Sequence, residues 1–483
     1  MNHIEQHILQ TRRRFLTSAA SGAGVAALAS MLRDDGLLAA ESSSAAGIID
    51  PLRPRPAHFP GKAKSCIFIF LAGGTSHLDL FDPKPKLAEL DGQQIPESFT
   101  KGVRFSFIKL NQSLLMGSRF KFKKYGQCGT EMSELLPHIG SCADDIALIR
   151  SMHHAAFDHA PGELEMITGK DIPGRPSFGA WLTYGLGSES QNLPGYVALI
   201  NHRGPVARAM AWGNGYLPSV HQGVVFRNQG EPILNLQTPD DIPPELHRAQ
   251  LDAMRELNRL KSTKIHDPEI DARIAAYELA YRMQTAAPEL IDIASETKPT
   301  LEAYGVERGG QKGIFSRNCL LARRLVERGV RVVSLFQRTW DQHKDLEGGL
   351  RSQCDEVDQP IGALLKDLKQ RGLLDSTLVV WGTEFGRTAI TENAKPGPGA
   401  GRDHHPHAFS MWMAGGGVKG GQVYGQSDDL GWAVAENGVH THDFHATLLH
   451  LFGFDHKKLT YRHRGLDVRL TDVAGNVVEK LLA

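Results

Sequence analysis

The sequence predicts an α/β fold with a mostly parallel central sheet and helices on both faces. An unbroken apolar run at residues 66–71 ends at Gly73 and Gly74, as expected for a strand buried on both faces of a parallel sheet. Further along, two helical patterns each end at a glycine and lead directly into an apolar strand. This repeated order of helix, glycine and strand is typical of a chain that returns repeatedly to one parallel sheet.

The elements can be assigned in chain order. The predicted strands are 66–71, 146–149, 197–200, 330–336, 378–381 and 409–413. The helix pattern at 321–326 ends near Gly329, the pattern at 361–368 ends at Gly372, and a last helix spans about 444–452. We expect the strands at 66–71, 330–336 and 378–381 to be parallel neighbours.

Composition narrows the functional classes. The chain has 483 residues, 41% of them hydrophobic, and its 54 basic residues balance 54 acidic ones. This balance argues against nucleic-acid binding and against a polybasic membrane-surface protein. The five cysteines match no zinc-binding spacing, whereas 22 histidines make a metal site more plausible.

The N-terminal segment is typical of an export signal. Residues 11–16, Thr-Arg-Arg-Arg-Phe-Leu, form a twin-arginine motif, and the apolar stretch at 17–32 contains too many Ser and Gly residues for stable membrane insertion. Small-residue cleavage sites follow at 38–40 or 44–46. We therefore expect recognition by the twin-arginine translocase and a periplasmic or extracellular location.

The predicted domain organisation follows from these features. A signal peptide covers 1–46, a Pro-rich linker covers 47–61, and one α/β domain covers 62–483. Residues 205–300 are polar, punctuated by prolines and then helical, which indicates an insertion or cap within that domain.

Polar side chains of metal-ligand type follow two of the predicted strands and precede a third. Asp341 and His343 follow the strand at 330–336, Glu384 follows 378–381, and His404 and His405 precede 409–413. Ligands of open α/β sheets bind at the carboxyl ends of the strands. Carboxylates with imidazoles suit zinc, manganese or iron, whereas carboxylates alone favour calcium or magnesium. We expect one divalent metal there, with zinc, calcium and manganese as candidates.

Several motifs together resemble a known family. They are Leu-Ala-Gly-Gly-Thr-Ser-His-Leu-Asp at 71–79, Phe-Asp-Pro-Lys-Pro at 81–85, Thr-Glu-Phe-Gly-Arg at 383–387, Gly-Arg-Asp-His-His-Pro at 401–406 and Gly-Leu-Asp-Val-Arg-Leu-Thr at 465–471. Over residues 62–483 the chain resembles a group of twin-arginine-exported, sulfatase-like proteins known mainly as a domain of unknown function. The group is similar to the alkaline phosphatase superfamily, so the resemblance implies an alkaline-phosphatase-like fold.

The resemblance also implies roles for individual residues. Asp341 and His343 fall where the superfamily has an Asp and a His on one metal, Glu384 falls at the next acid, and His404 or His405 falls at a later His. The chain departs from sulfatases in having glycines in place of the paired acids after the first strand. It also has His159 at the position of the sulfatase nucleophile, counted back from the Met-Ile-Thr-Gly sequence at 166–169.

The resulting hypothesis is a secreted, metal-dependent hydrolase of sulfate or phosphate esters, acting on a small-molecule or carbohydrate ester. Arg387 and Arg402 are candidates for binding the anionic oxygens. The nucleophile stays open between a metal-activated water, His159 acting covalently and Ser76. His159 could equally be a metal ligand, together with His153 or His154. The alternative function is a catalytically inactive, metal-containing binding protein on the same fold.

The export motif is directly testable. Replacing Arg12 and Arg13 with Lys should leave the precursor in the cytoplasm, because the translocase recognises the paired arginines. Cell fractionation and immunoblotting measure the distribution. Normal export of the double variant would contradict a twin-arginine signal.

Overall fold

The computed structural model describes residues 51–483 except 102–107, 228–230, 234–235, 239–242 and 266. The predicted signal peptide therefore lies outside the described residues, as does part of the predicted linker. Within the described part, the central sheet has nine strands in the order β12-β4-β11-β8-β1-β7-β5-β6, with β15 paired to β4. Their bounds are β1 Ser65–Ala72, β4 Ile146–His153, β5 Tyr196–Asn201, β6 Val224–Phe226, β7 Val332–Arg338, β8 Thr377–Gly382, β11 Phe409–Ala414, β12 Gln422–Tyr424 and β15 Val439–His440.

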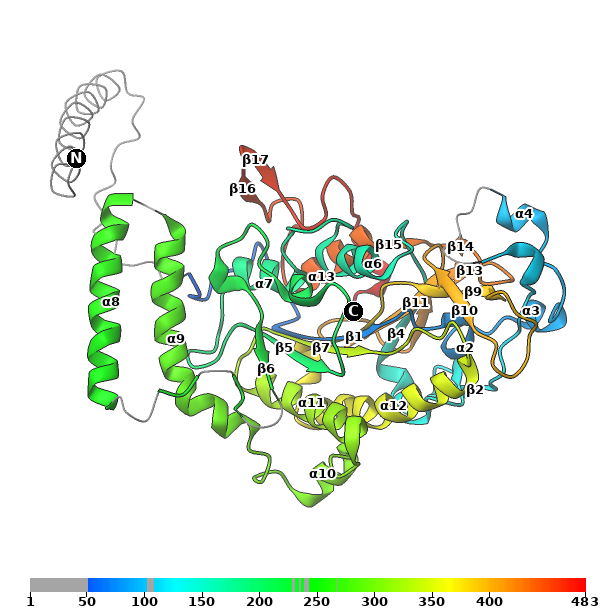
Figure 1. The fold of residues 1–483 in the computed structure, drawn as a ribbon, viewed down its shortest axis with the longest axis horizontal. Helices are drawn as coiled ribbons and strands as arrows, with labels where there is room; N and C mark the ends of the chain where they lie inside the picture. Colours follow the sequence, from blue (N-terminus) through cyan, green and yellow to red (C-terminus); the bar gives the residue numbers. More distant parts are fainter. Residues whose placement is uncertain (1–50, 102–107, 228–230, 234–235, 239–242, 266) are drawn as a thin grey trace, which may run out of the picture. The chain divides into compact units, whose positions relative to one another are not determined.

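Strand β1 lies at the centre of the parallel part of the sheet. Cys66 pairs in parallel with Val332 of β7 on one side and with Leu378 of β8 on the other. Strands β5 and β6 continue this parallel order beyond β7. The prediction of three parallel neighbours is confirmed, and the carboxyl ends of these strands meet at one edge of the sheet (Figure 1).

Helices cover both faces of the sheet, as predicted. Alternate residues of β1 point to opposite faces: Ile67 and Ile69 belong to one apolar core, and Phe68 and Phe70 belong to the other. Figure 1 shows α11 and α12 on the first face and α6, α7 and α13 on the second. These helices are α6 His159–Thr168, α7 Phe178–Leu186, α11 Gly310–Glu327, α12 Leu346–Gln370 and α13 Thr441–Leu451.

The predicted strand at 409–413 is present as β11, but it runs antiparallel to both β8 and β4. Between β8 and β11 the chain forms β9 (Gly386–Thr391) and β10 (Arg402–His405), which form a separate two-stranded sheet, and β9 also bridges to Leu115. Because no helix crosses the sheet in this interval, the chain returns beside β8 in the opposite direction. The sheet is therefore mixed on this side and parallel on the other.

The segment from about 205 to 300 contains two long helices, α8 (Pro244–Ile265) and α9 (Pro268–Ile291), which pack against each other. Shorter elements complete the chain: α2 His77–Leu80, α3 Pro85–Glu89, α4 Glu97–Thr100, α5 Pro137–Gly140, α10 Lys298–Tyr304, β2 Phe122–Tyr125, β3 Thr130–Ser133, β13 Gln426–Ser427, β14 Val434–Glu436, β16 Tyr461–His463 and β17 Leu466–Val468. Among the described residues, none of the helices combines the length and the apolar character needed to cross a membrane.

Three buried histidines that are not among the predicted site residues predict sensitivity to acid. Burial lowers the pKa of His77 to about 4 and the pKa of His221 and of His445 to about 3. Below pH 6.5 these residues take up protons in the unfolded chain before they do so in the native protein. The free energy of unfolding should therefore fall as the pH decreases from 6.5, by about 1.4 kcal/mol per pH unit for each histidine.

Urea unfolding between pH 7.5 and 5 measures this slope. The His445→Gln variant should reduce it by about 1.4 kcal/mol per pH unit, because one of the three groups is lost. A pH-independent free energy of unfolding below pH 6.5 would exclude the proposed protonation effect.

Candidate metal centre

Asp341 and His343 lie in the turn that follows β7. The N–H groups of Thr339 and Trp340 both donate to the carbonyl of Ala72 at 3.2 Å, which holds the turn against the end of β1. Thr339 has a φ of +120°, a conformation that a β-branched residue rarely adopts. The fully buried side chain of Trp340 anchors the same turn in the core. The position of the Asp341 carboxylate is thus determined by the sheet and the core together.

Two glycines allow the backbone to approach this turn closely. A Cβ atom at Gly73, whose φ is +125°, would lie 2.7 Å from the backbone of Trp340 and of Asp341. A Cβ atom at Gly401 would lie 2.1 Å from the carbonyl carbon of His343. Larger residues at either position would push the turn away, so the glycines after β1 have a packing role here.

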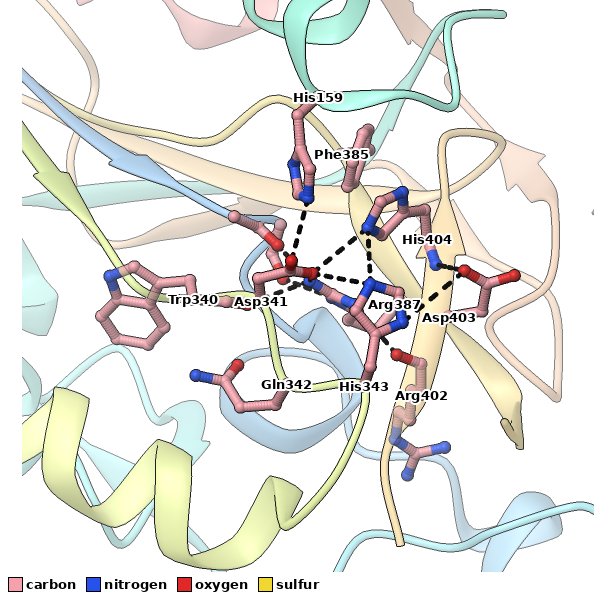
Figure 2. Close-up of polar contacts among 12 residues, drawn as sticks. His159, Trp340, Asp341, Gln342, His343, Phe385, Arg387, Arg402, Asp403 and His404 are labelled. Atoms are coloured by element: carbon pink, nitrogen blue, oxygen red, sulfur yellow. Dashed lines mark hydrogen bonds and ion pairs between the residues drawn. The ribbon is translucent and has the colours of Figure 1, made fainter. Parts of the chain in front are cut away.

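Four potential ligand groups converge at this edge (Figure 2). His159 is the first residue of α6, and His404 lies in β10. The Nε2 atoms of His159, His343 and His404 lie 3.1, 2.9 and 3.2 Å from carboxylate oxygens of Asp341. The Nε2 atoms of His343 and His404 are themselves 3.1 Å apart. One carboxylate and three imidazoles therefore face a common point.

Glu384 lies behind His159 and does not join the four converging groups. Its side chain is fully buried just after β8, and its Oε1 accepts hydrogen bonds from the Gly73 N–H at 2.7 Å and from His159 Nδ1 at 2.9 Å. A carboxylate can only accept here, so Nδ1 of His159 carries the proton and Nε2 faces Asp341. Glu384 was expected as a direct ligand; in the structure its contact with the four converging groups runs through His159.

The other two imidazoles are oriented in the same way. His343 donates from Nδ1 to the carboxylate of Glu392, and His404 donates from Nδ1 to the carbonyl of Phe157 at 2.8 Å. Each of the three Nδ1–H groups thus has an outer acceptor, so that each ring points its Nε2 atom at the centre. That atom donates to Asp341 when it carries a proton and offers a lone pair to a cation when it does not. Such outer hydrogen bonds are typical of histidines that bind metals.

The electrostatics of the cluster reflect this convergence. Burial alone would raise the pKa of Asp341, but hydrogen bonds from the three histidines and the nearby charge of Arg387 hold it far below the usual range. Burial opposes protonation of His159, yet its contacts with the two carboxylates raise its pKa to about 9. In His404, by contrast, burial outweighs the contact with Asp341 and lowers the pKa. The cluster therefore favours a positive charge at its centre.

His405 lies outside the cluster. It follows His404 on β10, and successive strand residues point to opposite faces. Its Nε2 donates to the carbonyl of Trp432 at 2.5 Å, and burial lowers its pKa to about 3. Of the two predicted histidines, only His404 joins the converging group. His153 and His154 do not belong to that group either.

The two predicted anion-binding arginines are both occupied by protein partners. Arg387 is fully buried and donates to the carbonyls of Gly73, Gly74, Trp340 and Arg402 and to Asp341. Arg402 is also fully buried; it pairs with Asp79 at 2.9 Å and donates to the carbonyls of Thr388 and Met116. This geometry does not support substrate binding by either arginine. Arg387 orients Asp341, and Arg402 connects the strand end to the core.

Ser76 is placed unfavourably for attack on a substrate. Its side chain is fully buried and donates to Asp79 at 2.5 Å, the same carboxylate that pairs with Arg402. The predicted nucleophilic role is therefore not supported, and Ser76 belongs to a buried structural network.

Two acids near the centre were not predicted. Glu392 follows β9 and accepts from His343, and the buried Asp403 lies between Arg402 and His404 with an oxygen 4.0 Å from His343 Nδ1. The sequence signal for Asp403 was its place in the His-containing motif at 401–406. No spacing or motif distinguishes Glu392 from an ordinary surface acid.

The close approach of Gly73 can be tested against a matched glycine. Gly92 also has a positive φ of +79°, but no atom lies within 4 Å of its hypothetical Cβ. Gly92→Ala should lower the free energy of unfolding by about 1 kcal/mol from backbone strain alone. Gly73→Ala adds a clash with the Asp341 turn and should cost about 2–4 kcal/mol more in urea unfolding. Equal effects of the two variants would show that the turn does not depend on Gly73.

Comparison with solved structures found matches of low sequence identity and low TM-score. The crystal structure of Ps i-CgsB in complex with k-i-k-neocarrahexaose is 12% identical with a TM-score of 0.37, covering 82% of this chain and 72% of the other. PsFucS1 sulfatase from Pseudoalteromonas sp. is 13% identical with a TM-score of 0.32, covering 81% of this chain and 68% of the other. Alkaline phosphatase from the Antarctic bacterium TAB5 is 12% identical with a TM-score of 0.30, covering 76% of this chain and 96% of the other. The α/β assignment itself stands on the observed sheet.

No curated protein matches this sequence. A family model does match, over residues 63–482, which includes every element of the sheet and all four converging side chains. The chain belongs to the family described as protein of unknown function (DUF1501).

Proposed function

We propose that this protein is a metal-dependent hydrolase of sulfate or phosphate esters. The proposal rests on one observation: Asp341, His159, His343 and His404 present four donor atoms to a common point, with every imidazole Nδ1 already bound elsewhere. Three Nε2 lone pairs cannot share that space with one carboxylate unless a proton or a cation lies among them.

The donor spacing fits a single metal ion. Zinc binds imidazole nitrogen at about 2.0–2.1 Å, so adjacent donors of a tetrahedral site lie about 3.3 Å apart. The separations of Asp341 from the three histidines are 2.9–3.2 Å. The donors would need to move outward only slightly to hold an ion.

The donor types favour a transition metal. Calcium prefers six to eight oxygen ligands, whereas zinc, manganese and iron accept imidazole nitrogen together with carboxylate oxygen. Of the candidates considered from the sequence, zinc and manganese therefore fit better than calcium. Such an ion would polarise an ester oxygen and lower the pKa of a nearby water molecule.

Substrate access is supported by the exposure of the site. The side chain of Asp341 is 38% exposed, which leaves one side of the centre open, as in catalytic rather than structural metal sites. A pocket of about 580 Å³ is lined by Ala155 and Phe157, just before His159, and by Pro406 and His407, just after His404. It is large enough for the alcohol part of a small-molecule or carbohydrate ester.

A second candidate function is a metal-containing binding protein without catalytic activity. It is favoured by His159, which occupies the position where the resembling sulfatases have their nucleophile. His159 Nε2 faces Asp341 as a metal ligand would, and the Ser76 hydroxyl is buried. Neither side chain is therefore placed to replace the nucleophile. The twin-arginine motif supports export in both cases, to the periplasm or beyond.

Metal binding and turnover distinguish these functions. Protein exported from its natural signal should contain about one zinc or manganese ion per chain by elemental analysis. His343→Ala and His404→Ala should each reduce metal content at least tenfold and lower the melting temperature of the loaded protein, because metal affinity adds to folding stability. Aryl sulfates and aryl phosphates then test for hydrolysis.

His463→Ala in the β16–β17 hairpin, away from the four donors, provides a matched control and should keep its metal. Bound metal without turnover of either ester class would favour the binding protein. Protein exported natively but free of metal would contradict both functions.

A further inference from the structure

Arg338 is a cation at the end of β7 that none of the described protein groups neutralises. It is the last residue of β7, three positions before Asp341, and it is half-buried. Its guanidinium has no hydrogen-bond or ion-pair partner among the described residues. Arg387, by contrast, is fully engaged by backbone carbonyls and Asp341.

The pleat of β7 determines which face Arg338 occupies. Val332 and Phe336 belong to the apolar core beneath α6, α7 and α13, whereas Val333 and Leu335 belong to the opposite core. Because side chains alternate along a strand, Arg338 shares the face of Phe336. This is the face covered by α6, the helix that begins with His159.

A neighbouring loop adds positive charge at this edge. Glu163, one turn after His159 on α6, accepts from the N–H groups of Val206 at 2.9 Å and Ala207 at 2.6 Å. The loop held in this way follows β5, the strand next to β7, and carries Arg203 and Arg208. Both of these arginines are exposed, and their guanidinium groups have no hydrogen-bond or ion-pair partner among the described residues.

We propose that Arg338 binds the tetrahedral oxyanion of the substrate, a sulfate or phosphate group, beside the metal centre. This inference rests on the proposed function and assigns a residue to the role that Arg387 and Arg402 cannot fill. A guanidinium can donate two parallel hydrogen bonds to such an anion. Arg203 and Arg208 increase the local concentration of anions by their charge.

Binding of inorganic sulfate and inorganic phosphate tests this assignment without requiring turnover. Isothermal titration of the full chain, metal-loaded and chelator-treated, measures both anions. Arg338→Gln should weaken binding of the anion that the wild-type protein prefers at least tenfold, and Arg338→Lys should weaken it less because it keeps the charge. Arg273→Gln removes an equally unpartnered, exposed arginine from α9 and should change affinity less than twofold.

The metal content of Arg338→Gln should equal that of the wild-type protein, and KM for an aryl ester should rise more than kcat falls. Wild-type affinity in Arg338→Gln would overturn the assignment, as would a failure of the wild-type protein to bind either anion. If the protein holds no metal and hydrolyses no ester, yet Arg338→Gln loses anion binding, the hydrolase proposal fails and the anion site stands. Comparing the two anions shows which ester class the site prefers.

Discussion

The hydrogen bonds on the outer side of three imidazole rings hold the whole centre in place. Glu384, Glu392 and the carbonyl of Phe157 each accept a hydrogen bond from the Nδ1–H of one histidine, which turns the three Nε2 atoms towards Asp341. These acceptors come from segments that follow β8, follow β9 and precede α6. The donor geometry is therefore a property of the sheet edge and its surrounding loops rather than of any single motif.

Close backbone packing makes that arrangement possible. Gly73, after β1, lets the Asp341 turn lie directly against the strand end. The N–H of Gly73 donates to Glu384, and the carbonyl of Gly73 accepts from Arg387. In this chain the peptide groups after the first strand organise the side chains of neighbouring strands. This accounts for the glycines that follow the first strand.

Much of the fold was predictable because it depends on local pattern. The apolar run at 66–71 and the two helices that end at glycines determine the parallel neighbours of β1, and Asp341 and His343 follow from their place after a strand. The roles of Glu384 and Arg387 were not predictable, because a carboxylate or guanidinium has the same sequence signature whether it faces a ligand or is enclosed by backbone. His404 and His405 illustrate the same point: their adjacency on a strand implies that only one can face the centre, but the sequence does not indicate which.

The position of β1 has a consequence for how the chain reaches its native state during synthesis. Cys66 pairs with Val332 and Leu378, roughly 270 and 310 residues later in the chain. An emerging polypeptide therefore exposes an apolar, unpaired strand until most of the domain has left the ribosome, and such strands promote aggregation. A fragment that ends before β8 lacks one of the two partners of β1. The parallel core around β1 can therefore be completed only after β8, at Thr377–Gly382, has been synthesised.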